Sequence, residues 1–441
     1  MLFNSISFLL FFPIVCVLYF LLPYRFRYLL LLVAGYVFYA YAEPFSLVFL
    51  LLTTLVTWIG GRLLHEGRRV GFAALLLALG LLAYFKYVPY VLSLFHAGEV
   101  SILLPLGISF YTFQSLTYCM DCYRKECKPV NNFLKYALFV SFFPTILAGP
   151  IARAKNLLPQ FEEQFDFDAL RAKEGLVYML WGYFLKLVIV SRLTILTDLV
   201  FDDASMRGLP VLVAVLAYSF QIYGDFAGYS YIAIGCAKIM GFTLPQNFRQ
   251  PYLAESVADF WRRWHISLSS WFRDYLYIPL GGNRRGTVRK YINVLIVFIV
   301  SGIWHGANIT FLFWGLLNGI YQVIGGVAAT VFPGWFAQSA RRSGAGEAGS
   351  AAASSSAVDS ASTGRVLHVL GTFALMTLTW VFFRAPSISD AFAILGRLFG
   401  GAYLSALTDG TLFTLGLGVK NLLFAFAALV LLIAADLLCE K

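Results

Sequence analysis

The stretch that decides the fold is residues 209–241, LPVLVAVLAYSFQIYGDFAGYSYIAIGCAKIMG. Its only charged residues are Asp225 and Lys238, and it exceeds the roughly 20 residues that a transmembrane helix needs. Eleven further apolar stretches occur, at about 3–22, 28–42, 45–60, 70–95, 101–120, 133–151, 174–200, 289–306, 309–332, 366–383 and 411–438. The sequence therefore predicts an all-α polytopic membrane protein, with one integral membrane domain over residues 1–441.

The composition of the 441-residue chain agrees with this prediction. Hydrophobic residues make up 60% of the chain and charged residues 13%, whereas soluble domains carry roughly 25% charged residues. So few charges could not cover the surface of a soluble protein of this size. Lys and Arg outnumber Asp and Glu by 33 to 23. We attribute this excess to basic loops that lie against anionic lipid, and not to binding of nucleic acid.

The early loops alternate in charge. Arg25 and Arg27 follow the first apolar stretch, and Glu43 follows the second. The third stretch is again followed by basic residues, Arg62, Arg68 and Arg69. Basic loops tend to stay in the cytoplasm, so the amino terminus is predicted to be extracytoplasmic.

Prolines interrupt stretches 101–120 and 133–151, which are therefore predicted to be kinked or re-entrant. The topology beyond residue 130 stays open.

Two segments need a separate interpretation. Residues 339–364 consist largely of Ala, Ser and Gly and are predicted to form a flexible loop within the domain. The spacing Cys119-x-x-Cys122 could indicate a metal or redox site. No second Cys or His pair stands near it in the sequence, so we interpret both as small apolar packing residues and predict no metal.

The first polar cluster surrounds His305, between two strongly apolar stretches. A polar group at membrane depth is costly and therefore indicates function, and an imidazole can take a proton from a hydroxyl and return it. Gly302 and Gly306 flank it and would let a ligand or another helix approach. Trp304 and Asn308 are predicted to support the site. The alternative is a packing histidine bonded to a carbonyl.

The second cluster is residues 258–274, ADFWRRWHISLSSWFRD. If this segment is helical, Asp259 pairs with Arg263 four residues later, and His265 lies beside a stripe of tryptophans. Trp and Arg together are typical of an interfacial or re-entrant helix. Either His265 belongs to a polar site, or it lies at headgroup level on a surface anchor helix.

The third cluster is inside stretch 209–241, where Gln221 and Asp225 are four residues apart and would share a helix face. An Asp in the bilayer needs a partner, and Arg262, Arg263 or a Tyr hydroxyl are the candidates. We expect both residues to brace helices, with direct catalysis as the alternative.

Several long motifs, in one order, resemble the membrane-bound O-acyltransferase (MBOAT) superfamily, and within it the branch that O-acetylates bacterial polysaccharides such as alginate. The resemblance runs from the amino terminus nearly to the end of the chain. It rests on PLGISFYTFQ from Pro105, AGPI from Ala148, QIYGDFAGYS from Gln221, DFWRRWHISL from Asp259, YIPLGGN from Tyr277, GIWHG from Gly302 and FFRA from Phe382.

The resemblance implies a ring of tilted transmembrane and re-entrant helices around a tunnel, in the inner membrane of a bacterial cell. It implies that His305 lies in the tunnel, and that His265 is the second polar position. The acyl group, expected to be acetyl, would come from a cytoplasmic donor such as acetyl-CoA. It would pass to an extracytoplasmic serine-type acetyltransferase or to the glycan itself, and no bound cofactor is expected. His305 would act as general base, and His265 would position or polarise the acyl carbonyl.

Three other functions stay open at this point. The acyl group could be D-alanine destined for teichoic acid, or the acceptor could be a lipid. A polysaccharide or small-molecule transporter or channel would also show intramembrane Asp and His, although it predicts repeated halves, and none is evident in the sequence. The sequence does not identify the polysaccharide.

Overall fold

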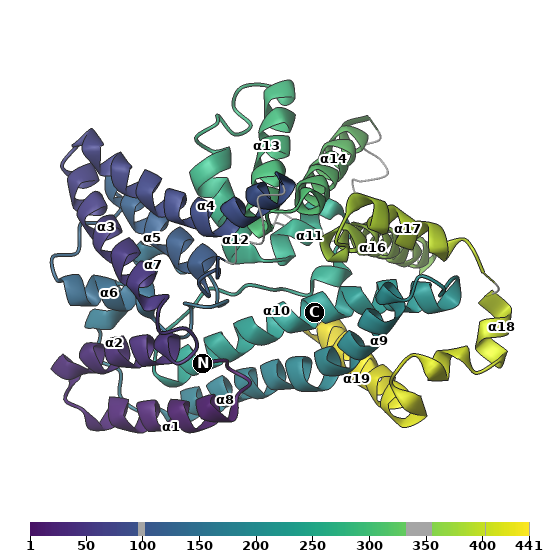
Figure 1. The fold of residues 1–441 in the computed structure, drawn as a ribbon, viewed down its shortest axis with the longest axis horizontal. Coiled ribbons are helices and arrows are strands. Elements are labelled where there is room, and N and C mark those ends of the chain that lie inside the picture. The colour runs from purple at the N-terminus through teal and green to yellow at the C-terminus, as the bar shows by residue number, and fades with distance from the viewer. Residues whose placement is uncertain (96–101, 332–354, 402, 441) are drawn as a thin grey trace. The chain divides into compact units, whose positions relative to one another are not determined.

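The structure, a computed structural model, describes residues 1–95, 102–331, 355–401 and 403–440 (Figure 1). Within these ranges the secondary structure is helical throughout, with no strand. The predicted all-α class is therefore confirmed. The chain divides into two compact units, one of Met1–Val190 with Tyr223–Gln246 and one of Ser191–Ile222 with Asn247–Lys441, which we term unit 1 and unit 2.

Unit 1 contains the first eight α-helices. They are α1 (Ile6–Leu21), α2 (Tyr24–Ala40), α3 (Leu47–His65), α4 (Phe72–Leu94), α5 (Ile108–Tyr123), α6 (Phe133–Ser141), α7 (Ala154–Leu157) and α8 (Ala169–Tyr183), with 3-10 turns at Arg69–Gly71 and Pro159–Glu162. A π-helix, Phe184–Val190, continues α8.

Unit 2 contains most of the later helices. They are α9 (Ser191–Asp202), α11 (Val257–Arg263), α12 (Ile266–Phe272), α13 (Thr287–His305), α14 (Ile309–Val331), α16 (Ser355–Arg384), α17 (Ile388–Leu398), α18 (Tyr403–Thr408) and α19 (Gly418–Cys439), with short turns at Pro251–Leu253, Arg273–Tyr277 and Thr411–Thr414. Helix α10 (Leu209–Ile239) contributes its first part to unit 2 and its second part to unit 1.

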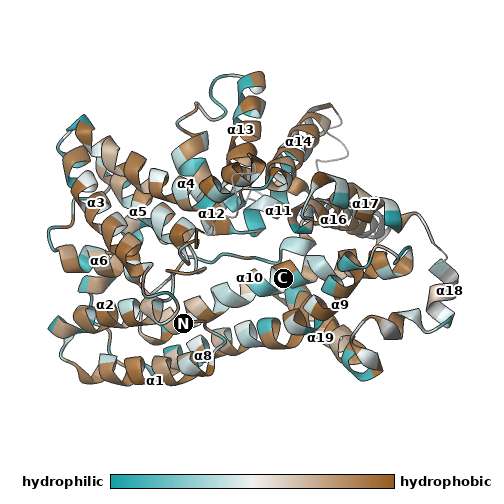
Figure 2. Ribbon diagram, in the orientation of Figure 1, coloured by the Kyte–Doolittle hydropathy of each residue, from teal (hydrophilic) through white to brown (hydrophobic). Residues whose placement is uncertain are grey.

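Seven helical segments of the described ranges are long and apolar enough to cross a membrane. They are Leu47–His65, Arg69–Leu94, Leu209–Ile239, Thr287–His305, Ile309–Val331, Gly364–Arg384 and Gly418–Cys439. Helix α1 is apolar but shorter, and hydrophobic residues predominate along α1 and α3 in Figure 2. The prediction of a multi-pass membrane protein is thus confirmed, although several of the twelve apolar stretches hold shorter helices.

The two proline-interrupted stretches contain these shorter helices. Helix α5 begins only at Ile108, and α6 ends at Ser141. The chain then runs without a regular helix as far as Arg153, yet Phe142 and Phe143 are fully buried. Non-helical backbone in an apolar environment has to be enclosed by protein in this way. Regular helix is thus absent around the prolines of both stretches, and their kinked or re-entrant course stays a prediction.

The predicted flexible loop falls largely outside the described ranges, which omit residues 339–354. Its remainder, residues 355–364, forms the first turns of α16, which begins at Ser355. The predicted end of the loop at residue 364 was therefore ten residues too late. Ala has the highest helix propensity of all residues and Ser is tolerated, so an Ala- and Ser-rich composition does not by itself exclude a helix.

Cys119 and Cys122 pack in the core of unit 1, where both are fully buried. The Cys119 thiol donates to the carbonyl of Thr57 at 3.2 Å, and Cys122 Sγ lies 3.4 Å from Cys127 Sγ. These contacts agree with the interpretation of Cys119 and Cys122 as packing residues.

Two pairs of glycines bring α8 and the second part of α10 together. A Cβ added to Gly235 would lie 2.5 Å from the Gly175 carbonyl oxygen, and one added to Gly182 would lie 2.6 Å from that of Gly228. Seven residues separate the two glycines on each helix, which is about two turns, so the pairs form one antiparallel seam. Small residues at the contact are typical of helix packing in membranes.

Candidate functional site

His305 is the last residue of α13 and is half-buried. Three aromatic rings surround its imidazole. The ring centroids of Trp304, Trp314 and Phe383 lie 4.9, 5.1 and 5.4 Å from the centroid of the His305 ring. Because Trp314 is on α14 and Phe383 on α16, three helices of unit 2 hold the imidazole in an apolar cage that leaves part of it accessible.

Close contact between α13 and α14 fixes the end of the helix that carries His305, and Figure 1 shows the two helices side by side. A Cβ added to Gly302 would lie 2.3 Å from the carbonyl oxygen of Phe311, and one added to Gly315 2.3 Å from that of Phe298. The Phe311 ring covers Gly306. Gly302 and Gly306 were predicted to let either a ligand or another helix approach, and the structure shows the approach of another helix, α14.

Asn308 has a capping role. Its Oδ1 accepts the backbone N–H of Thr310 at 3.0 Å, at the start of α14, and its Nδ2 donates to the carbonyl of Pro386 at 2.6 Å. The amide therefore connects the start of α14 to the segment that follows α16. This contact braces the turn that follows His305.

His265 joins α11 to α12 and is 2% exposed. Its Nδ1 lies 3.1 Å from Oδ1 of Asn247, and its ring centroid lies 6.3 Å from that of Trp304. His265 is outside the seven candidate spans. Burial lowers its pKa well below the usual range, and the positive charge that His305 can carry lowers this pKa further.

The two predicted histidines therefore belong to one cluster of unit 2, although forty residues separate positions 265 and 305. Trp304, which is 7% exposed, neighbours both, since its ring centroid lies 4.9 Å from that of His305 and 6.3 Å from that of His265. A histidine that is only 2% exposed is enclosed by protein, which favours the polar site over a position on a surface anchor helix.

Asp259 belongs to a network of ion pairs and not to the aromatic cluster. Its carboxylate lies 2.8 Å from Nε of Arg263, which confirms the predicted pair, and Arg263 also contacts Glu440 at 2.7 Å. Arg365 extends the network to Glu440 at 3.4 Å and to Glu255 at 3.2 Å. The network connects α11 to the start of α16 and to the end of α19, which indicates a structural role.

Gln221 braces α10 against α9 within unit 2. Its Nε2 donates to the Thr194 hydroxyl at 2.9 Å, and its Oε1 accepts from the Thr197 hydroxyl at 2.7 Å. Both contacts agree with the brace that the sequence predicted.

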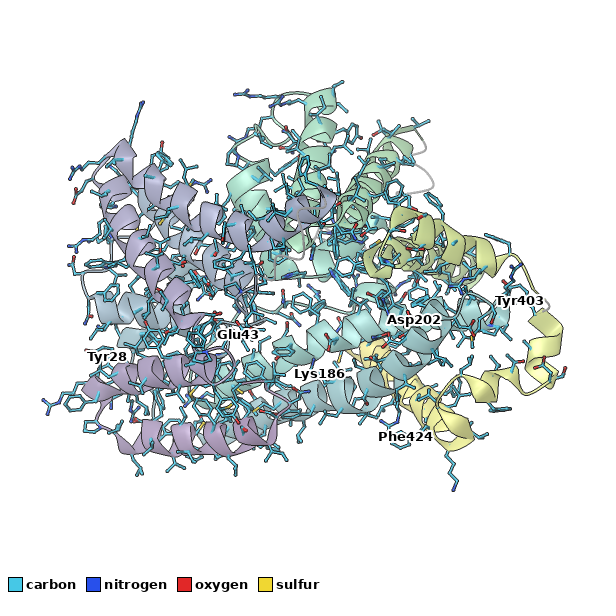
Figure 3. All side chains as sticks on the ribbon, in the orientation of Figure 1. Tyr28, Glu43, Lys186, Asp202, Tyr403 and Phe424 are labelled. Carbon is cyan, nitrogen blue, oxygen red and sulfur yellow. The ribbon has the colours of Figure 1, made fainter. Side chains whose placement is uncertain are left out.

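Asp225 pairs with a residue that the sequence analysis missed. Its carboxylate lies 2.5 Å from Nζ of Lys186 (labelled in Figure 3), and Lys186 also lies over the ring of Tyr229, 4.4 Å from its centroid. The arginines named as candidate partners, Arg262 and Arg263, pair with Asp259 instead. A lysine inside the apolar stretch 174–200 was the signal that could have identified the partner.

The site contains three other residues that sequence reasoning missed. Trp314 and Phe383 enclose His305. Phe383 lies in the FFRA motif, but the sequence assigned neither residue a role in the site, because both look like ordinary apolar packing residues. Asn247 contacts His265 from eighteen residues earlier in the chain, and no helical or strand period predicts a contact at that spacing.

Comparison with known proteins identifies the family. The family model of membrane-bound O-acyltransferases, MBOAT, matches residues 130–348. The "Probable alginate O-acetylase AlgI" of Pseudomonas aeruginosa is 37% identical over 97% of this chain and 81% of its own length. The "Peptidoglycan O-acetyltransferase" of Helicobacter pylori is 34% identical over 84% of this chain and 73% of its own.

More distant relatives match only part of the chain. The "Teichoic acid D-alanyltransferase" of Streptococcus thermophilus is 30% identical over 52% of this chain and 58% of its own length. Since relatives at 34 to 37% identity extend over most of both chains, this chain belongs to the membrane-bound O-acyltransferase family.

Proposed function

We propose that this O-acyltransferase passes an acetyl group from a cytoplasmic thioester donor, such as acetyl-CoA, to hydroxyl groups of an extracytoplasmic polysaccharide such as alginate. The acetyl group reaches the glycan directly or through a secreted serine-type acetyltransferase. The observation that carries the proposal is the cluster of His265, Trp304 and His305 inside one unit of a chain that resembles alginate O-acetylases over 97% of its length.

The chemistry assigned to the cluster is general-base acyl transfer. A hydroxyl oxygen of the acceptor attacks the acyl carbonyl carbon of the thioester while His305 takes the hydroxyl proton. The new C–O bond forms, the C–S bond of the donor breaks, and the proton moves from His305 to the leaving sulfur. An ester and a free thiol result, and His305 returns to its neutral form.

The surroundings of His305 support its assignment as the base. Its ring is half-buried, whereas that of His265 is 2% exposed, so His305 offers the more accessible imidazole to a hydroxyl. The aromatic cage excludes water from part of the imidazole, which favours transfer of the acyl group to the acceptor over hydrolysis. His265 is assigned a supporting role, in which it orients the reacting groups.

The proposed location is the inner membrane of a bacterium, with the amino terminus outside the cytoplasm. The charge pattern of the first three loops supports this orientation. Donor thioester would then approach from the face that carries Arg25, Arg62 and Arg68, and the acetylated product would leave on the opposite face.

The His305→Ala variant tests the assignment in cells that make the polymer. We expect the O-acetyl content of the secreted polysaccharide to fall to background while the protein accumulates normally in the membrane. A matched control is His65→Ala, since His65 lies at the end of α3 in unit 1 and should leave acetylation unchanged. Near-normal acetylation with His305→Ala, at equal protein level, would refute the role of His305.

A further inference from the structure

Asn247 holds the start of α12. Its main-chain oxygen accepts the backbone N–H of Ile266 at 2.9 Å, and its Oδ1 accepts the backbone N–H and the hydroxyl of Ser267 at 3.2 and 2.9 Å. The first N–H groups of a helix have no partner within the helix. His265 occupies the capping position, but its side chain makes no capping bond, so Asn247 caps α12 from outside.

The same oxygen determines which ring nitrogen of His265 carries the proton. The backbone N–H of Ser267 can only donate, so the Asn247 side-chain atom that faces it has to be the amide oxygen. An amide oxygen can only accept, and it lies 3.1 Å from Nδ1 of His265. Nδ1 therefore carries the proton, and in the neutral imidazole Nε2 keeps the lone pair.

Two further observations show that this arrangement is fixed. Asn247 and His265 are 0% and 2% exposed, so water does not compete for the bond between them. His265 also has a left-handed backbone, with φ 45° and ψ 52°. Residues other than glycine adopt this conformation where the surroundings enforce it, and such residues cluster at functional sites.

We propose that Asn247 is a positioning residue for acyl transfer, and that its Oδ1 holds His265 as the Nδ1–H tautomer so that Nε2 faces the reacting groups as an acceptor. The proposal rests on the proposed function, because it assumes that His265 acts in the same reaction as His305. The outer partner of an imidazole commonly fixes its tautomer and orientation in this way.

The tautomer changes the role expected for His265. A neutral imidazole whose lone pair is on Nε2 cannot donate a hydrogen bond from that nitrogen, so it does not polarise an acyl carbonyl. It accepts instead, from the hydroxyl of the acceptor or from an N–H group of the donor. His265 would thus orient a donor group of one substrate while His305 removes the hydroxyl proton.

Nitrogen NMR of purified full-length protein, isotopically labelled at histidine, tests the tautomer without any activity assay. The signal of His265 is assigned by its loss in His265→Asn. We expect Nδ1 to be protonated in the wild type and in Asn247→Asp, Nε2 to be unprotonated in the wild type, and a mixture of tautomers in Asn247→Leu. A proton on Nε2 in the wild type, or an unchanged Nδ1–H signal in Asn247→Leu, would overturn the proposal.

The pH profile of acetyl transfer separates positioning from a structural cap. Asn247→Leu should lose about ten- to a hundredfold in rate. Asn247→Asp keeps an acceptor oxygen, but its negative charge favours the imidazolium. The acid limb of its profile should therefore move to higher pH by about one to three pH units. His305 on α13 is the titratable group whose charge acts on the pKa of His265, and on α11, two residues before His265, Arg263 is ion-paired with Asp259.

Ser269→Ala is the matched control on the same helix, since its hydroxyl bonds the Trp264 carbonyl at 3.3 Å. Its pH profile should match that of the wild type. A profile of Asn247→Asp that also matches the wild type would reduce Asn247 to a helix cap. Absence of acetyl transfer by the wild type would refute the proposed function, and the NMR signal would still decide the tautomer. If Asn247→Leu fails to accumulate, the NMR signal of the wild type and the pH profile of Asn247→Asp still decide the proposal.

Discussion

At the scale of single residues, the site depends on how little water reaches two imidazoles. His265 is almost fully enclosed, and His305 is only partly enclosed by three aromatic rings. Burial disfavours a charged imidazole, so His265 stays neutral where a solvent-exposed histidine would begin to charge. The two histidines therefore have the same side chain, but the fold encloses one imidazole more completely than the other.

The first prediction concerns the pH dependence of stability. The unfolded chain binds a proton at His265 near pH 6.5, whereas the folded chain has its pKa well below that value. Below pH 6.5 the unfolded state thus binds more protons than the folded state. As the pH decreases, the free energy of unfolding falls by about 1.4 kcal/mol per pH unit until the pKa of His265 in the folded chain is reached. Removing His265 should remove this loss.

Melting temperatures of the purified protein in detergent, at about pH 7.5 and about pH 5, check the prediction. The decrease between the two pH values should be smaller for His265→Asn than for the wild type, while Ser269→Ala, which removes no titratable group, should behave like the wild type. Equal decreases for His265→Asn and the wild type would contradict it.

At the scale of elements, glycines determine how closely the helices pack. Gly302 and Gly315 bring α13 and α14 into backbone contact, and this contact positions the end of α13 where His305 lies. The α8–α10 seam uses the same principle in unit 1. Helices in lipid associate through such close packing, because lipid tails are as apolar as leucine and offer no hydrophobic gain.

The second prediction tests this contact. Gly302→Ala would place a Cβ 2.3 Å from a backbone oxygen of α14, and overpacking of this kind costs about 1–3 kcal/mol. Both the melting temperature and acetyl transfer should decrease. Gly325→Ala on α14 is the control, since nothing lies within 4 Å of its added Cβ, and it should leave both unchanged or raise stability slightly. Equal effects of the two substitutions would contradict the packing argument.

The third prediction concerns the ion pair between the π-helix and α10. Lys186→Met leaves Asp225 without its cation inside an apolar span, so the amount of protein in the membrane should decrease. The double variant Lys186→Met with Asp225→Asn removes the charge and should recover most of that amount. Quantitative immunoblots of membranes measure both, and a double variant as poor as the single one would show that the pair is not a mutual brace.

The sequence predicted more of the fold than of the site. Each of the twelve apolar stretches contains a helix in the structure, because lipid demands apolar runs of a length that is visible in sequence. His305 and His265 came from family motifs, and periodicity alone left each with a structural alternative. Asn247 and Lys186 were missed, since contacts across eighteen and thirty-nine residues follow from tertiary packing and not from local period.

At the scale of the whole molecule, the chain combines a small share of charged residues, 13%, with a large share of hydrophobic ones, 60%. Seven helical segments of the described ranges can span a membrane, and the first loops alternate between basic and acidic residues. Orientation in the membrane would follow from those loops, and an acyl transfer with donor and acceptor on opposite faces requires a fixed orientation.

The fourth prediction tests that orientation. Ala42 and Arg68 lie in successive loops and are exposed. A membrane-impermeant maleimide should label Ala42→Cys in intact cells, above the labelling of the parent chain, and should label Arg68→Cys only after the membrane is permeabilised. The reverse pattern would place the amino terminus in the cytoplasm.

The most direct test of the central claim is acetyl transfer by the purified protein in proteoliposomes, with labelled acetyl-CoA and a hydroxyl acceptor, either alginate or the serine-type partner. We predict alkali-labile labelled ester on the acceptor, release of one thiol per ester, and loss of both with His305→Ala. Ester formation that persists in His305→Ala, or glycan flux across the vesicles with no ester from the wild type, would contradict the account.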